Sequence, residues 1–440
     1  MMSVLLIGLD RTRVRTSVWL VVLSCLALLT GCGNFGRLAA DILETQERLR
    51  VVSGQIEAPA CKDCEVIVVV MGDDHGQEIH NYRVFERPGR FRLAALHDSR
   101  FLVAFQDLNR DFAYQSNEPA VWYDLSGSLI KRGDVENIVL SLNGPSARPL
   151  PPALENLFEL RGNSLGKIDV QLGKVVSLDD ERFSRESATM SMWEPIGFMK
   201  AGRAGIFFLE PYDPAKIPVL FVHGINGTGR NFASMIEHLD RQRFQPWVLN
   251  YPSGMDLRAL GDGLVGLLAE LRHRYGFSRM HLVAHSMGGL MVREYLAECA
   301  RTNSCEYAGN FVSISSPYGG IPNMELWLDF ARVVMPAWRN LVPDGPFLKN
   351  LFALPLPNGV RHTLLISYRN TSSFSRESSD GVIPLKSQFQ RDAQRQAVTI
   401  RGFDEDHVSI LQSPDVHSEV NLALLADDAT QRAGLAGPGR

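Results

Sequence analysis

The 440-residue sequence has no block of basic residues in its body and no excess of positive charge. Lysine and arginine number 45 against 49 aspartates and glutamates, for a formal net charge of −4. Proteins that bind nucleic acid carry basic patches, so nucleic acid is not an expected partner. Internal repeats and low-complexity tracts are also lacking. Because 45% of the residues are hydrophobic, the chain can bury a core, which excludes a disordered protein.

Long apolar runs are absent apart from one near the N-terminus. Basic residues between positions 11 and 15 precede an apolar run at 18–29, which leads into Leu29-Thr-Gly-Cys32. A spanning helix needs about 20 apolar residues, so this shorter run indicates a secretory signal peptide. Its end resembles the lipobox of bacterial lipoproteins. The resemblance implies cleavage before Cys32 and lipidation of Cys32, and Gly33 then favours the outer membrane of the bacterial cell envelope. An ordinary signal peptide or an uncleaved anchor is the alternative.

Cysteine is scarce, with six residues in the whole chain. Cys25 would leave with the signal peptide and Cys32 would carry the lipid. The even number that remains, in an oxidising compartment, favours disulfides over free thiols or a metal site. The expected pairs are local in sequence, namely Cys61 with Cys64 and Cys299 with Cys305.

Two blocks of different periodicity make up the body of the chain. Short runs of alternating apolar residues between turn residues predict an all-β sandwich in the first block. In the second block, strands alternate with helices, which predicts a mostly parallel sheet covered by helices on both faces. We expect a signal peptide at 1–31, a tether at 32–48, the β-sandwich at 49–145, a connector at 146–204, the α/β domain at 205–427 and a flexible tail at 428–440.

The sharpest chemical motif is His281-Leu-Val-Ala-His-Ser-Met-Gly-Gly289. Ser286 follows an apolar strand and precedes a helix, with Ala284 and Gly288 two residues to either side. The motif resembles the nucleophile elbow of α/β-hydrolases, with Ala284 in place of the first glycine. Bulky residues at these positions would clash with the adjacent strand and helix. A serine that only caps a helix is the alternative.

A glycine-rich segment, Val222-His-Gly-Ile-Asn-Gly-Thr-Gly229, follows the first buried strand of the same block. Through His223 and Gly224, it is similar to the His-Gly oxyanion loop of bacterial lipases. The resemblance implies that the backbone N–H groups of Ile225 and Met287 hold the oxyanion, with His223, Gly224, His285 and Gly288 shaping the loop and the elbow. A P-loop is excluded, because no lysine followed by serine or threonine comes next.

An acid and a histidine must follow the nucleophile in this family. Asp380-Gly-Val-Ile-Pro384 and Asp406-His407-Val-Ser-Ile410 resemble the strings that carry them in lipase-like hydrolases. The resemblance assigns Asp380 as the acid and His407 as the base. The rival bases are His417, His285 and His281, and the rival acids are Asp404 and Asp406.

The resemblance is therefore to the α/β-hydrolase superfamily, and within it to bacterial lipases and GPI-inositol-deacylase-like hydrolases. It implies an α/β-hydrolase fold preceded by a smaller all-β domain, no cofactor, and a membrane-anchored serine hydrolase that cleaves lipid or acyl esters. A thioesterase or acyltransferase would use the same residues. A surface-tethered binding protein, in which the β-sandwich acts and the hydrolase domain is a scaffold, is the alternative from another class. Protein partners cannot be inferred from the sequence.

Two further segments carry expectations about ligands. The apolar segment 318–358 exceeds the single stripe that a surface helix needs, so we expect a cap that presents Trp327 and Leu328 to an acyl chain; an ordinary core helix with a loop is the alternative. In the first domain, Asp107, Asn109, Asp111 and Glu118 follow the ligand spacing of a calcium loop. Phe112 stands where such a loop has glycine, so an Asp/Asn-rich hairpin turn is favoured over calcium.

Overall fold

The computed structural model describes residues 33–44, 47–60, 63–75, 78–128, 133–157, 170–331, 333–370 and 378–435. The expected signal peptide, Cys32 and Cys61 lie outside these ranges. In the described part of the chain, no helix combines the length and hydrophobicity needed to cross a membrane.

The first domain is a sandwich of two β-sheets. One sheet has the strand order β4-β1-β7 and the other β3-β2-β5-β6. Apolar residues such as Val52, Val68 and Leu102 form the core between them. Strand β2 is buried along its whole length, because its other face packs under a second cluster that includes Leu154. The strands are β1 (Leu49–Glu57), β2 (Glu65–Met71), β3 (Ile79–Phe85), β4 (Arg90–Leu96), β5 (Phe101–Asp107), β6 (Ala120–Asp124) and β7 (Val135–Ser141).

The second domain is built on an eight-stranded sheet with the order β15-β14-β13-β12-β10-β11-β9-β8. Neighbours from β11 through β10 to β15 are parallel, whereas β9 runs antiparallel to β11. The expected α/β class is confirmed. The strands are β8 (Gln171–Val175), β9 (Gly205–Phe208), β10 (Ile217–Val222), β11 (Phe244–Asn250), β12 (Met280–His285), β13 (Ala308–Ile314), β14 (His362–Ser367) and β15 (Ala397–Phe403).

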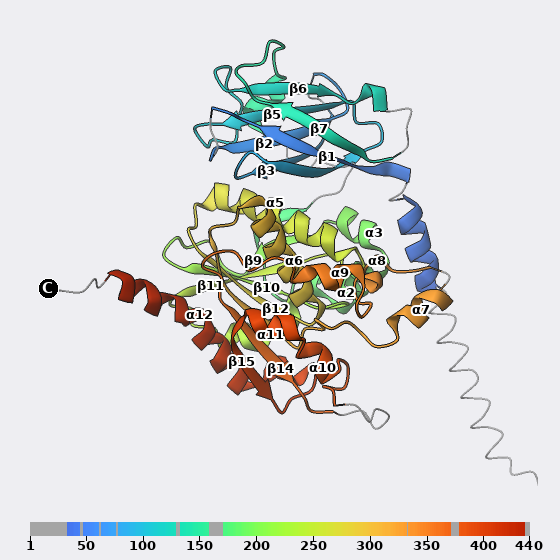
Figure 1. Cartoon of the computed structure of the whole chain (residues 1–440), viewed down its shortest axis with the longest axis vertical. Helices are drawn as coiled ribbons and strands as arrows, with labels where there is room; N and C mark the ends of the chain where they lie inside the picture. Colours follow the sequence, from blue (N-terminus) through green and yellow to red (C-terminus); the bar gives the residue numbers. More distant parts are fainter. Residues whose placement is uncertain are drawn as a thin grey trace, which may run out of the picture.

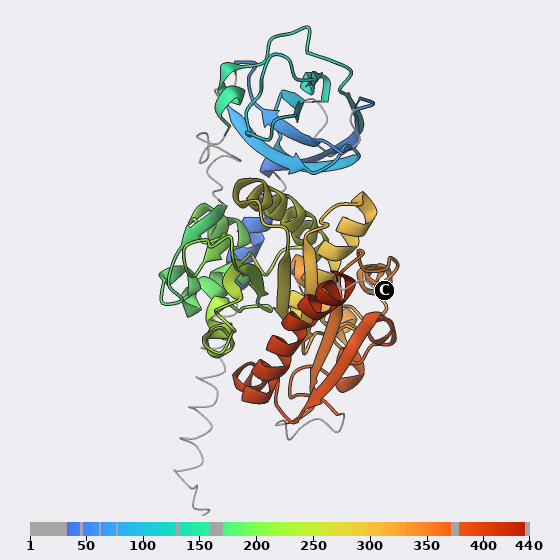
Figure 2. The same cartoon turned by 90° about the vertical axis from the view of Figure 1, so that its left-hand side faces the viewer.

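Helices cover both faces of this sheet, as Figures 1 and 2 show. Leu220 and Val222 of β10 point into a core with helices α5 and α6, whereas Val219 and Phe221 point into a core with α4 and α12. This alternation is what a strand buried on both faces requires. The helices are α2 (Arg185–Trp193), α3 (Pro195–Lys200), α4 (Ala233–Glu237), α5 (Leu257–Tyr275), α6 (Met287–Thr302), α7 (Met324–Phe330), α8 (Pro336–Arg339), α9 (Pro346–Leu351), α10 (Leu385–Gln388), α11 (Arg391–Gln396) and α12 (Pro414–Leu435).

Two expected boundaries differ from the structure. Strand β8 pairs with β9, so the segment 146–204, expected as a connector, already contributes an edge strand and helices α2 and α3 to the second domain. Helix α12 continues to Leu435 and so includes most of the segment 428–440 expected as a flexible tail. The helix can extend this far because the sequence has no proline between Pro414 and Pro438, and proline is the residue that most strongly breaks a helix.

A helix at residues 33–44 opens the described chain and docks on the second domain. Leu38 is fully buried in the core, and the Phe35 ring lies 5.1 Å from the ring of Trp193. Asp41 accepts hydrogen bonds from the backbone N–H groups of Ile196 and Gly197, at 2.8 and 3.1 Å. The segment expected as a tether is therefore a packed part of the fold over these residues.

Polar contacts join the β-sandwich to helix α5, which lies beside β3 (Figure 1). Arg83 forms an ion pair with Asp262 at 2.9 Å, and Arg272 forms one with Glu86 at 2.9 Å. The other Glu86 carboxylate oxygen accepts a hydrogen bond from the backbone N–H of Cys305 at 2.8 Å. Cys305 is in turn bonded to Cys299 by a disulfide at the end of α6. Cys64 is also disulfide-bonded.

Candidate active site

Ser286 occupies a tight turn between strand β12 and helix α6. Its backbone angles are φ 55° and ψ −129°, a conformation that costs a non-glycine residue about 1–3 kcal/mol. A Cβ on Gly288 would lie 2.5 Å from the backbone oxygens of both Val222 and His223. The turn therefore requires glycine at this position, for the steric reason expected from the sequence.

Three of the predicted site residues meet in one hydrogen-bonded array. The Nε2 atom of His407 lies 3.0 Å from the Ser286 hydroxyl oxygen. The Nδ1 atom of the same ring lies 2.7 Å from Oδ2 of Asp380. All three residues are buried, and they come from loops at the carboxyl ends of β12, β14 and β15. With Nδ1 protonated, Nε2 is free to accept the serine proton.

The Asp380 carboxylate is surrounded by hydrogen-bond donors. Burial alone would raise the pKa of Asp380, but hydrogen bonds and the charge of His407 outweigh it and hold the pKa below its usual value. The donors are the His407 ring, the Ser367 hydroxyl at 2.8 Å, the Gln388 amide at 3.0 Å and the backbone N–H groups of Val382 and Ile383 at 3.0 and 2.6 Å. The acid is thereby kept ionised and fixed in orientation.

His285, the residue before the serine, contacts the base rather than replacing it. Its Nε2 atom lies 2.9 Å from the backbone carbonyl oxygen of His407, and the two rings are 4.7 Å apart. Burial, followed by the charge of His407, lowers the pKa of His285 to about 3. A neutral imidazole that donates from Nε2 would therefore hold the main chain of His407 in place.

The predicted oxyanion loop lies against the serine. A Cβ on Gly224 would approach the Ser286 Cβ to 2.8 Å, so only glycine allows this contact. The Tyr251 hydroxyl donates a hydrogen bond to the His223 carbonyl oxygen at 2.7 Å. Within the described ranges, neither Ile225 nor Met287 has a hydrogen-bond partner for its backbone N–H. Both groups are therefore available to an incoming anion.

The rival acids and bases have other contacts. His281 accepts a hydrogen bond from the backbone N–H of Asn310 at 2.9 Å, and His417 lies 2.9 Å from the Leu411 carbonyl oxygen. Asp406 accepts hydrogen bonds from two backbone N–H groups in the turn after His407. Asp404 forms a surface ion pair with Arg369 at 3.3 Å.

Sequence reasoning missed Ser367, Gln388 and Tyr251. Ser367 ends β14 and Gln388 ends α10, and neither lies in a motif. No signal in the sequence identifies them, because their role depends on which loops the fold brings together.

The segment 318–358, expected as a cap, divides into two parts. Helix α7 exposes Leu326 and Trp327, which are 56% and 69% accessible, and Leu328 is half-buried. Its second part, by contrast, contributes Met335, Leu341 and Phe347 to the core of the domain. Helix α7 thus exposes large apolar side chains that could meet a substrate from the surface.

The expected calcium-loop residues bind their own loop. Asp107 accepts hydrogen bonds from the backbone N–H groups of Asp111 and Phe112, and Glu118 accepts them from Leu108 and Gln115. Asn109 donates to Asp111 at 2.8 Å. These contacts are those of an Asp/Asn-rich turn.

A cavity of about 960 Å³ lies between the two domains, at a distance from this array. It is lined by β1, β3, β4 and β7 on one side and mainly by α5 and α6 on the other, and its lining includes none of the three array residues.

Residues 217–344 match the family model described as the alpha/beta hydrolase fold. A comparison with curated proteins gave no match. Among solved structures, the mature lipase BlEst2 of Bacillus licheniformis aligns with 20% identity and a TM-score of 0.40, covering 50% of this chain and 97% of that one. Lipase B of Aspergillus fumigatus aligns with 18% identity and a TM-score of 0.39, covering 52% and 57%. The matched family model begins with β10 and contains the elbow, in agreement with the sheet order described above. The larger domain of this chain therefore has the α/β-hydrolase fold.

Proposed function

We propose that the protein is a serine hydrolase of carboxylic esters, with Ser286 as nucleophile, His407 as general base and Asp380 as the orienting acid. The observation that carries the proposal is the continuous array from the Ser286 hydroxyl through the His407 ring to the Asp380 carboxylate, with separations of 3.0 and 2.7 Å. A nucleophile, a base and an orienting group in hydrogen-bond contact are the arrangement that acyl transfer requires.

The reaction would proceed in two balanced halves. His407 Nε2 takes the Ser286 proton as the Ser286 oxygen attacks the ester carbonyl carbon. The resulting oxyanion accepts hydrogen bonds from the backbone N–H groups of Ile225 and Met287. The imidazolium then protonates the leaving alcohol, which departs and leaves an acyl-enzyme. In the second half, His407 deprotonates a water molecule that attacks the acyl carbon, and the proton returns to Ser286.

We further propose that the substrates are lipid or acyl esters and that the protein is lipid-anchored through Cys32 in the bacterial cell envelope. Two observations support this choice. Residues 33–44, which directly follow Cys32 in the sequence, form a helix that is docked on the hydrolase domain, which would place the domain beside its anchor. Helix α7 exposes a leucine and a tryptophan, side chains that suit contact with acyl chains or a membrane interface.

Labelling with a fluorophosphonate probe tests the nucleophile. Wild-type protein should be labelled stoichiometrically, and the Ser286→Ala variant should not be labelled. Ser286→Ala and His407→Ala should each lose on the order of 10⁴-fold or more in p-nitrophenyl ester hydrolysis, because the array acts as a unit. A folded wild-type sample without labelling at Ser286 would refute the proposal and favour the binding-protein alternative.

A panel of substrates then separates the enzyme classes. Short and long p-nitrophenyl esters, phospholipids and acyl thioesters are compared by kcat/KM, with and without an added alcohol as acceptor. We expect oxygen esters with long chains to be preferred. Preference for thioesters, or product that appears mainly on the added alcohol, would replace esterase by thioesterase or acyltransferase.

The anchor is tested by Cys32→Ser. We expect the variant to be unlipidated, and either soluble or retained as precursor, whereas wild-type protein fractionates with membranes. A Cys32→Ser protein that matures and fractionates like wild type would show that the lipobox interpretation is wrong.

A further inference from the structure

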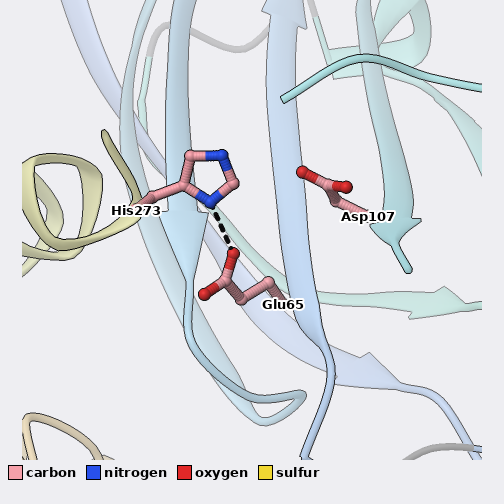
Figure 3. A group of neighbouring side chains, drawn as sticks. All are labelled: Glu65, Asp107 and His273. Carbon is pink, nitrogen blue, oxygen red and sulfur yellow. Dashed lines mark hydrogen bonds and ion pairs between the residues drawn. The ribbon is translucent and has the colours of Figure 1, made fainter. Parts of the chain in front are cut away.

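Three side chains that the proposed reaction does not use converge where the two domains meet. Glu65 begins β2, Asp107 ends β5, and His273 projects from α5 of the hydrolase domain toward both (Figure 3). One ligand atom from each lies within 4.8 Å of the others. His273 Nδ1 is 2.7 Å from Oε2 of Glu65. The cluster therefore combines one imidazole with two carboxylates from three separate elements.

The two carboxylates are placed where like charges repel. Glu65 and Asp107 are directly opposite in the antiparallel β2–β5 ladder, and like charges in such a pair are destabilising. Both residues are buried, with 8% and 1% of their surface accessible. Burial removes the water that would otherwise screen the repulsion. A strongly bound cation between them would remove this cost.

Protein cations compensate the cluster only in part. His273 supplies at most one positive charge. Arg110 lies 3.8 Å from Glu65, and its side chain is 64% exposed, so solvent screens the pair. Asp111 and Glu118 contribute two further carboxylates near Asp107. Arg272, which also acts on Glu65, is engaged by Glu86 at 2.9 Å. Negative charge thus remains in excess around a buried imidazole.

We propose that Glu65, Asp107 and His273 form a binding site for a divalent transition-metal cation of the Zn²⁺ type, which joins the β-sandwich to the hydrolase domain. An imidazole nitrogen with two carboxylate oxygens is a ligand set that suits zinc. Calcium, in contrast, takes six to eight oxygen ligands. The metal would take the place of the hydrogen bond between His273 and Glu65. Each Asp107 oxygen accepts one backbone N–H, from Asp111 or Phe112, and keeps a second lone pair with which Asp107 could serve as the third ligand.

The surroundings of the cluster suit a structural role. The Phe112 ring lies 5.1 Å from the His273 ring and is itself buried, so it shields the imidazole from water. Two ligands belong to the β-sandwich and one to α5. Because a metal that bridges the domains binds only when they are docked, its binding free energy would stabilise the docked arrangement.

Calorimetric titration of the full chain in mild detergent with ZnCl₂ tests the site. We expect one Zn²⁺ per chain, and at least about 10-fold weaker binding for His273→Gln and for Glu65→Gln. His75→Gln is the matched control, because His75 is an exposed histidine 3.3 Å from Asp74; its affinity should equal that of wild type. Zn²⁺ should also raise the melting temperature of wild type and of His75→Gln, but not of His273→Gln.

Two measurements keep the test decisive if the variants fold poorly. Co²⁺ bound to wild-type protein should give visible d–d absorption that stoichiometric Zn²⁺ abolishes, and CaCl₂ should produce neither heat nor displacement of Co²⁺. The proposal is overturned if wild type binds no Zn²⁺, if folded His273→Gln and Glu65→Gln bind it with wild-type affinity, or if Ca²⁺ displaces Co²⁺. Ester hydrolysis plays no part in these readouts, so a failure here leaves the serine hydrolase proposal untouched.

Discussion

At the scale of single residues, the position of the His407 main chain depends on a neighbour within the elbow. The His285 ring reaches the His407 carbonyl oxygen at 2.9 Å from the residue that precedes the proposed nucleophile. The backbone of the base and the side chain of the nucleophile are thereby tied to one turn. In the proposed mechanism, His285 is therefore a positioning residue, since it would act on the reacting atoms through His407.

Replacing His285 should separate this role from a merely structural one. His285→Leu removes the donor, and we expect kcat to fall by about 10-fold or more with KM little changed, because small misplacements of catalytic groups are costly. His285→Gln keeps an amide donor at similar reach and should recover most of kcat. Steady-state kinetics on a short ester, with melting temperatures as a check on folding, provide the measurement. Equal losses for both variants would contradict a hydrogen-bonding role.

The acid should matter less than the nucleophile. Asp380→Asn keeps the shape of the side chain but removes the charge that stabilises an imidazolium, so its loss in kcat should be smaller than that of Ser286→Ala. The double variant Ser286→Ala/His407→Ala should be no worse than either single one, since a base without its nucleophile has nothing to activate. An additive loss in the double variant would argue against a single functional unit.

Single residues also show where prediction from sequence ends. Ser286, Asp380 and His407 belong to short motifs, and each motif follows a strand whose apolar run is visible in the sequence. Gln388 belongs to no motif, yet it donates to Asp380 because α10 packs beside the end of β14. Such supporting contacts arise from tertiary packing between distant loops, which a local pattern cannot encode.

At the scale of elements, the elbow requires a close approach between helix α6 and strand β10. A Cβ on Gly288 would overlap two backbone oxygens, which cannot move like a flexible side chain. By comparison, Gly263 is an exposed residue of α5 with no atom within 4 Å of a Cβ. The two glycines therefore form a matched pair, for which alanine is expected to change the stability in opposite directions.

Alanine substitution should have opposite effects at these two positions. Gly288→Ala should lower both the melting temperature and ester hydrolysis, because the loop that carries Ile225 must shift. Gly263→Ala should raise stability by roughly 0.5–1 kcal/mol, the usual gain of alanine over glycine inside a helix, with activity unchanged. Thermal denaturation and p-nitrophenyl ester assays check both variants. A neutral Gly288→Ala would show that the elbow tolerates a wider turn.

Helix α7 offers a test of substrate contact. Since Trp327 is largely exposed and Leu328 is half-buried, replacing both by serine should lower the melting temperature only slightly. If α7 meets the acyl chain, long-chain ester hydrolysis should fall more than short-chain hydrolysis, by 10- to about 200-fold at most. Ratios of kcat/KM on matched chain lengths give the answer. Equal losses on both substrates would assign the helix a structural role only.

Elements with strong periodicity were predicted well, and edge elements were not. The sequence predicts a long helix from Leu257 to Tyr275, and helix α5 has those limits in the structure, where Asp256 caps its start and Gly276 its end. Strand β8 was missed because its sequence, Gln171-Leu-Gly-Lys-Val175, has few apolar residues. An edge strand pairs on one side only, so burial leaves little trace in its sequence.

At the scale of the whole molecule, four buried histidines link stability to pH. Burial is the largest cause that lowers the pKa of His223 to about 4 and those of His281, His285 and His362 to about 3. All four are neutral in the folded protein at pH 5, whereas an unfolded imidazole with a pKa near 6.5 is then mostly protonated. Unfolding below pH 6.5 therefore takes up protons, and stability falls as pH decreases toward 4.

Denaturant unfolding should reveal this dependence. Between pH 7 and pH 5, each of the four histidines should reduce the free energy of unfolding by about 2 kcal/mol. Urea midpoints measured at pH 7, 6 and 5 should decrease steadily, and His362→Asn should show a shallower decrease. Midpoints that are equal at pH 7 and pH 5 would contradict burial of these rings in the neutral form.

The overall class of fold followed from the sequence, but the arrangement of the domains did not. Period-two strands and alternating strands and helices predicted a β-sandwich followed by an α/β domain. Their docking depends on contacts such as Arg83 with Asp262 and Glu65 with His273, which join positions 179 and 208 residues apart. Polar pairs at such separation leave no local pattern, because each residue alone resembles an ordinary surface charge.

The docked N-terminal helix limits how far the proposed enzyme can travel. A flexible tether would let the domain range over roughly 3.5 Å for every linker residue. Here residues 33–44 form a helix, which Asp41 and Leu38 fix to the hydrolase domain. With the lipid attachment proposed at Cys32, almost no linker would separate the lipid from the docked helix. The enzyme would then stay close to the membrane surface. Its encounters with substrate would then be a two-dimensional search, governed by lateral diffusion and surface density in the bilayer rather than by concentration in solution.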